Sequence, residues 1–153
     1  MLALVVATAL QAASAQVPCP TPPPVAPGLE GWASAGRATK RLPLGHRVDV
    51  ALSPLAQVRY ALAPEKPGTD AQSGAVLRFN VPRAGTYRIA LGAAAWIDVV
   101  AGGSAVPSTG HGHGPACTGI RKIVDFTLAP GAHLLQISGS DARTIAVLIA
   151  PAR

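Results

Sequence analysis

Four histidines are present, and two of them, His111 and His113, are separated by a single glycine. Imidazole is a common ligand of copper, zinc and iron, and a His-x-His pair on a strand points both rings to one side of the sheet. Tight binding of a divalent metal needs a third ligand. The candidate donors of that ligand are His46, His133, Asp98 and Asp125. The alternative is that the glycines around the pair make a loop in which both histidines are simply exposed.

Trp96 and Asp98 form a second candidate site, because residues two apart on a strand share one face. An indole beside a carboxylate offers a flat platform and a hydrogen-bond acceptor, an arrangement that suits a sugar ring or another flat ligand. The alternative is that Trp96 fills the core, since the chain has few other aromatic residues.

Signatures of covalent or acid–base catalysis are absent from the sequence. No Gly-x-Ser-x-Gly motif occurs, and no phosphate-binding glycine loop precedes a helix. Asp98 and Asp125 are the one carboxylate pair that could act in glycoside hydrolysis. These observations favour a non-catalytic binding protein over an enzyme.

The net charge of +6 comes from basic residues that are spread along the chain. Apart from Lys40-Arg41 and Arg121-Lys122 they are isolated, and no aromatic residues are interleaved with them. Nucleic-acid interfaces combine clustered basic residues with stacking platforms, so this pattern argues against nucleic acid as a partner.

The first 15 residues are typical of a signal peptide. An apolar run over residues 2–10 is followed by Ala13-Ser14-Ala15, the small residues that signal peptidase requires. No later stretch is apolar for long enough to span a bilayer, so the mature chain is expected to lack a transmembrane anchor. We therefore predict a periplasmic or secreted protein.

Two cysteines, Cys19 and Cys117, are present, and an even count in a small exported domain favours a disulfide. Cys19 lies in a Pro-rich segment, residues 16–28, which we call the strap and expect to be extended. A disulfide would fasten the strap to the remaining residues, 29–153, which have the length of one domain.

The 31 glycines and prolines disfavour helices, and apolar residues alternate with polar ones in several short runs. The predicted strands include Val76–Val81, Tyr87–Leu91, Trp96–Val100, Lys122–Leu128, His133–Ile137 and Thr144–Ile149, and further strands are expected at Leu29–Ala33, Arg47–Leu52 and Val58–Leu62. A surface loop is expected between Pro64 and Gly74. About eight or nine short strands predict an all-β, two-sheet β-sandwich or jelly roll.

Two segments, residues 79–89 and 126–137, share the order strand, Pro- and Gly-containing turn, strand. This pattern over residues 75–150 resembles exported bacterial jelly-roll accessory modules of the carbohydrate-binding and pre-peptidase C-terminal types. The resemblance implies a jelly-roll fold and a binding role. The expected partner is a cell-wall or envelope polysaccharide, or an envelope protein.

The layout of residues 109–117 is also similar to that of short exported proteins that carry the name homogentisate 1,2-dioxygenase. That resemblance implies a small metal-dependent oxidoreductase that uses iron, copper or zinc, with His111 and His113 as two of the ligands. A non-haem iron site of this kind adds a carboxylate to two histidines, and no Asp or Glu lies near the pair in the sequence.

Overall fold

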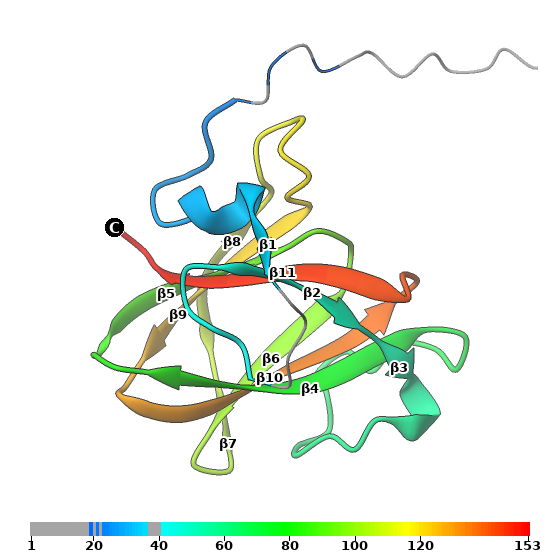
Figure 1. The fold of residues 1–153 in the computed structure, drawn as a ribbon. Coiled ribbons are helices and arrows are strands. Elements are labelled where there is room, and N and C mark those ends of the chain that lie inside the picture. The colour runs from blue at the N-terminus through cyan, green and yellow to red at the C-terminus, as the bar shows by residue number, and fades with distance from the viewer. Residues whose placement is uncertain (1–18, 20, 22, 37–40) are drawn as a thin grey trace, which may run out of the picture.

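The structure is a computed structural model that describes residues 19, 21, 23–36 and 41–153 (Figure 1). The predicted signal peptide lies outside the described residues. Within them the chain forms strands and two short 3-10 helices, η1 (Glu30–Ala33) and η2 (Leu55–Gln57), and no α-helix. No helix among these residues is long and apolar enough to cross a membrane.

The strands form two packed sheets, which confirms the predicted β-sandwich (Figure 1). The six-stranded sheet has the order β1 (Ala35–Gly36), β2 (Arg47–Ala51), β11 (Thr144–Pro151), β5 (Gly85–Leu91), β9 (Lys122–Leu128) and β8 (Ser108–Gly112). The five-stranded sheet has the order β3 (Ser53–Pro54), β4 (Ser73–Val81), β10 (Gly131–Ser140), β6 (Trp96–Ala101) and β7 (Ser104–Val106). Eight of these eleven strands in the described residues are five or more residues long, close to the predicted number.

Long strands that follow one another in the chain alternate between the two sheets, except for β8 and β9, which pair in the six-stranded sheet. The order β2-β11-β5-β9 in one sheet faces β4-β10-β6-β7 in the other. This order is that of a jelly roll, the fold that the sequence predicts. Of the paired strands, β1 and β2 run parallel, and the other pairs are antiparallel.

The core between the sheets is built by the alternation that the sequence shows. In β4, Leu77, Phe79 and Val81 are buried, whereas Arg78 and Asn80 are exposed. The same inward parity holds in β5 and β9, so both sheets contribute large aliphatic and aromatic side chains to one core cluster. Burial of this apolar surface is the main force that holds the sheets together.

The two strand-turn-strand segments that carry the resemblance to accessory modules form as predicted, and each turn leads the chain from one sheet to the other. The turn after β4 leads into β5, and the turn after β9 leads into β10. Gly131 opens β10 with a φ of +123°, a conformation that side chains other than glycine rarely adopt. Tyr87 is buried and its hydroxyl donates a hydrogen bond to the Arg83 carbonyl at 2.9 Å, which fixes the turn between β4 and β5.

The predicted strand at Leu29–Ala33 is wrong, because this segment forms η1. Leu29 and Trp32 lie three residues apart and are both buried on the outer face of the six-stranded sheet. A 3-10 turn places residues at this spacing on one side. The turn lies against the chain at Gly45, where a Cβ on Gly31 would lie 1.9 Å from the Gly45 carbonyl oxygen.

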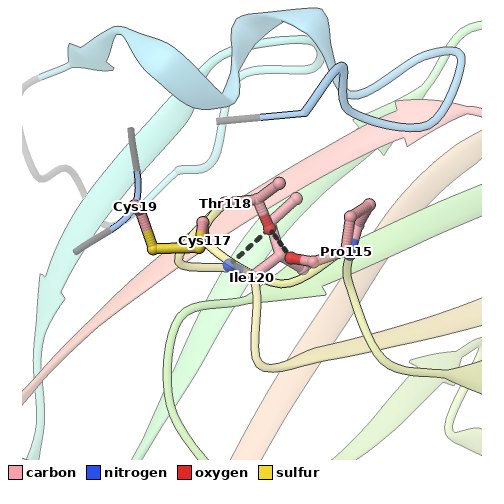
Figure 2. Close-up of a disulfide and its surroundings, with 5 residues drawn as sticks. All are labelled: Cys19, Pro115, Cys117, Thr118 and Ile120. Carbon is pink, nitrogen blue, oxygen red and sulfur yellow. Dashed lines mark hydrogen bonds between the residues drawn. A yellow bond between two sulfur atoms is a disulfide. The ribbon is translucent and has the colours of Figure 1, made fainter. Parts of the chain in front are cut away.

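The disulfide between Cys19 and Cys117 is confirmed, with a Cα–Cα distance of 5.8 Å (Figure 2). It joins the strap to the loop that follows β8. Thr118 stabilises this loop, since its hydroxyl donates to the Pro115 carbonyl and accepts from the Ile120 amide. The Trp32 indole donates to the Thr118 carbonyl at 2.9 Å, so η1 and the disulfide loop are held together.

The outer face of the five-stranded sheet is crossed by residues 58–72, which we call the crossing loop. The strand predicted at Val58–Leu62 is therefore wrong. The amide N–H groups of Ala61 and Leu62 both donate to the Gln136 side-chain oxygen, at 2.7 and 3.2 Å, and the Gln136 side-chain nitrogen donates to the Leu62 carbonyl at 3.0 Å. The buried Gln136 side chain thus satisfies backbone groups of the crossing loop that would pair with a neighbouring strand if the loop were part of a sheet.

Candidate binding site

A groove of about 490 Å³ lies where the two sheets part, between the β6–β7 edge of one and the β8–β9 edge of the other. Its most buried lining residues are Ile97, Val124 and Phe126, all of which belong to the core cluster. More exposed lining residues include Glu65, Lys66, Trp96, Asp98, Ser108, His111 and Lys122. The groove therefore has apolar depths and a polar rim, the composition typical of small-molecule and glycan sites.

Trp96 and Asp98 lie on one face of β6, as the two-residue spacing predicts. The Trp96 indole N–H donates to Asp98 Oδ1 at 2.9 Å, and both residues line the groove. Trp96 is half-buried and lies outside the two core clusters of the described residues, so it does not fill the core. The hydrogen bond fixes the plane of the ring in the groove wall.

Asp98 also fastens the crossing loop beside the groove. Its Oδ2 accepts a hydrogen bond from the Glu65 amide at 3.2 Å, and the Ser138 hydroxyl donates to the Lys66 carbonyl at 2.8 Å. Together with Gln136, these two contacts hold the loop against β6 and β10. Each carboxylate oxygen of Asp98 therefore accepts a structural hydrogen bond, one from the Trp96 ring and one from the backbone of the crossing loop.

Two ammonium groups lie against the Trp96 ring. Lys66 Nζ lies 4.4 Å and Lys122 Nζ 4.8 Å from the ring centroid, within the range of cation–π attraction. Lys122 Nζ also donates to the Ala95 carbonyl at 3.0 Å. Burial lowers the pKa of Lys122 below its ordinary value of 10.5, and repulsion by Lys66 lowers it further, whereas Asp98 raises it. The rim at Trp96 is thus a site where positive charge is concentrated.

The sequence analysis missed both lysines. Lys122 could have been found, because it has the same parity on β9 as the inward-facing Val124 and Phe126. A lysine at an inward position near the end of a strand indicates a polar opening in the sandwich. Lys66 comes from a loop, and only the hydrogen bonds of that loop to β6 and β10 bring it to Trp96.

His111 and His113 lie in different surroundings. His111 is on β8 opposite Val124, and it lines the groove without a hydrogen bond or an ion pair inside the described part of the chain. His113 follows the end of β8, and its Nδ1 lies 2.9 Å from the Arg121 carbonyl oxygen and 3.0 Å from an Arg121 guanidinium nitrogen. β8 is an edge strand of its sheet, and both histidine side chains are exposed.

Asp98 and Asp125 each line a hollow together with His111, but both carboxylates are held by other groups. Asp125 forms an ion pair with Arg88 at 3.0 Å, and His133 is buried in the core, where it stacks on Phe79. Asp98 is held by Trp96 and Glu65, as described above. Within the described residues, no three His, Cys, Asp or Glu side chains gather in a group that could hold a metal ion. The histidine pair thus gains no third ligand in this part of the chain.

The lining residues also form no recognisable catalytic pair. Ser108 and His111 both face the groove, yet no hydrogen bond joins them in the described residues. Asp98 and Asp125 lie in different sheets, and each is committed to its own neighbours. The arrangement offers an aromatic wall, apolar depths and cations, which are the elements of binding.

No family model, no curated protein and no solved structure matches this chain.

Proposed function

We propose that this chain is a non-catalytic binding module of the extracytoplasmic space, with its ligand site in the groove at Trp96. The observation that carries the proposal is a groove lined both by apolar side chains of the core and by a half-buried indole that is hydrogen-bonded to Asp98. A site formed in advance in this way binds without the entropic cost of ordering its walls.

A glycan is the ligand class that suits this site best. The CH-rich face of a sugar ring contacts an indole favourably, and the hydroxyl groups at the ring edge need hydrogen-bonding partners. Ser108, His111 and the two lysines supply such partners at the rim. The resemblance of the strand-turn-strand segments to carbohydrate-binding accessory modules supports the same ligand class, with cell-wall or envelope polysaccharide as the expected partner.

The disulfide supports the proposed location. Both cysteines are exposed, and an exposed disulfide persists where the surroundings are oxidising. In bacteria such surroundings are the periplasm and the outside of the cell, where envelope polysaccharides are found.

The test is a glycan array followed by titration of the best ligands into wild type, Trp96→Ala and Trp96→Phe. We expect Trp96→Ala to lose about 5- to 150-fold in affinity, because removing an aromatic anchor of a binding site costs about 1 to 3 kcal/mol. Trp96→Phe should keep part of the affinity. Binding that is equal in wild type and Trp96→Ala, with both proteins folded, would contradict the proposed site.

A further inference from the structure

We infer that the glycan bound in the groove is acidic, and that a sugar carboxylate pairs with Lys66 and Lys122 while its ring contacts Trp96. This inference rests on the proposed function and specifies its ligand as a glycan that contains uronic acid. It follows from the placement of charge at the groove rim.

The two lysines converge on one ring, and no carboxylate of the described residues lies at ion-pair distance from either. The ion pairs in the described residues join Arg47 to Asp49 and Arg88 to Asp125, both away from the groove. Two ammonium groups that approach the same indole repel one another, and the attraction of Lys122 to Asp98 offsets this repulsion only in part because Asp98 forms no ion pair with either lysine. An anion that pairs with both would relieve this repulsion.

The two carboxylates that line the groove do not take this role. Asp98 accepts hydrogen bonds from the Trp96 indole and the Glu65 amide, and it lies beyond ion-pair distance of both lysines. The Glu65 side chain is exposed and makes no ion pair within the described residues. The ammonium protons of Lys66, and those of Lys122 that Ala95 does not accept, therefore remain available for a ligand.

The geometry links charge recognition to ring recognition. Both ammonium nitrogens lie within 5 Å of the indole centroid, so a carboxylate held between them brings its pyranose ring beside Trp96. A neutral sugar could make the aromatic contact alone, and a simple anion could make the ionic contact alone. A uronic acid makes both, and this combination predicts selectivity for uronic acids over neutral sugars and over anions that lack a sugar ring.

The experiment is calorimetric titration of the whole protein at physiological salt with four probes: trigalacturonate, its trimethyl ester, maltotriose and triglutamate. The ester has the same sugar rings without the charge, and triglutamate has charge without sugar rings. Short ligands avoid the general attraction between a cationic protein and a long polyanion. We expect trigalacturonate to bind at least about 10-fold more tightly than the other three probes, since a charge-assisted hydrogen bond in a partly buried site is worth about one order of magnitude.

Variants of the two lysines locate the effect. Lys122→Met should weaken trigalacturonate binding about 10-fold, and Lys66→Met about 3-fold because Lys66 is more exposed. Lys122→Arg keeps the charge and should retain most of the affinity. Arg83→Gln also removes one positive charge, at an exposed position in the turn between β4 and β5, and should change nothing. Thermal melts establish that each variant is folded.

These experiments distinguish a failure of the acidic-glycan inference from a failure of the proposed binding function. If the ester or maltotriose binds as tightly as trigalacturonate and Trp96→Ala still abolishes binding, the inference is wrong and the binding function stands. Equal binding of triglutamate and trigalacturonate would overturn the inference, because the site would then recognise charge without sugar. If no sugar binds, or if Trp96→Ala has no effect, the proposed function itself fails.

Discussion

Gln136 is the single side chain on which the position of the crossing loop depends most, and its replacement gives a measurable prediction. Gln136 is 1% exposed and makes three hydrogen bonds to the loop backbone at Ala61 and Leu62. Gln136→Leu removes all three while it keeps a side chain of similar volume. Ser138→Ala removes the one bond to the Lys66 carbonyl and serves as a graded comparison.

The magnitude follows from the number of bonds. A hydrogen bond contributes about 1 kcal/mol net, so three bonds give a loss of about 3 kcal/mol. Ala61 is exposed and its amide can reach water when the loop moves away, which reduces the loss to about 2 kcal/mol. Ser138→Ala should cost about 1 kcal/mol. Urea denaturation measures both values, and hydrogen exchange should show faster exchange of the Ala61 and Leu62 amides in Gln136→Leu.

The loop also holds Lys66 at Trp96, so Gln136→Leu should weaken ligand binding although Gln136 does not line the groove. The reasoning is refuted if Gln136→Leu unfolds within about 0.5 kcal/mol of wild type and its Ala61 and Leu62 amides stay protected.

Three further predictions follow from the same structure. Replacing Cys19 and Cys117 by serine should lower the free energy of unfolding by about 2 to 4 kcal/mol, the loss expected when a 98-residue crosslink is removed; unchanged urea midpoints would contradict this. Because the pKa of Lys122 lies below 10.5, its positive charge should be lost at a lower pH than that of an ordinary lysine. Between the lowered pKa and pH 10.5, the folded state binds fewer protons than the unfolded state, so the free energy of unfolding should rise with pH in this window. The affinity for an acidic ligand should fall over the same window, because Lys122 loses its charge. Lys122→Met should show neither effect. Gly31→Ala should cost at least about 2 kcal/mol, since its Cβ would collide with the backbone at Gly45, and a wild-type thermal midpoint would refute this close contact.

The sequence predicts those parts of the fold that depend on alternation within one strand. Leu77, Phe79 and Val81 face the core because residues two apart share a face, and this holds wherever a strand is long. The two turns that connect the sheets are also predictable, because Pro and Gly residues mark them locally. Alternation fails to predict the segments at 29–33 and 58–62. Leu29 and Trp32 pack on the outer face of the six-stranded sheet, and residues 61 and 62 donate hydrogen bonds to Gln136, which is distant in the sequence.

Part of the candidate site, the pair Trp96 and Asp98, is predictable from the sequence. Trp96 and Asp98 belong to one strand, so their shared face follows from spacing. Lys66 and His111 reach the same groove from a loop and from the other sheet, and such contacts depend on tertiary packing. The glycines around His111 led to the expectation of a loop, whereas pairing with β9 makes residues 108–112 a strand. Non-local pairing overrides weak local propensity at a sheet edge.

The chain contains two tryptophans, and this allows a direct test of where the ligand binds. Trp96 lies in the groove, whereas the Trp32 indole donates to the Thr118 carbonyl beside the strap. In a ¹⁵N-correlated NMR titration with trigalacturonate, the account predicts that the Trp96 indole signal shifts in a saturable manner while the Trp32 indole signal stays in place. A shift of Trp32 alone, or saturable binding by calorimetry without any change at Trp96, would contradict the claim that the groove is the binding site.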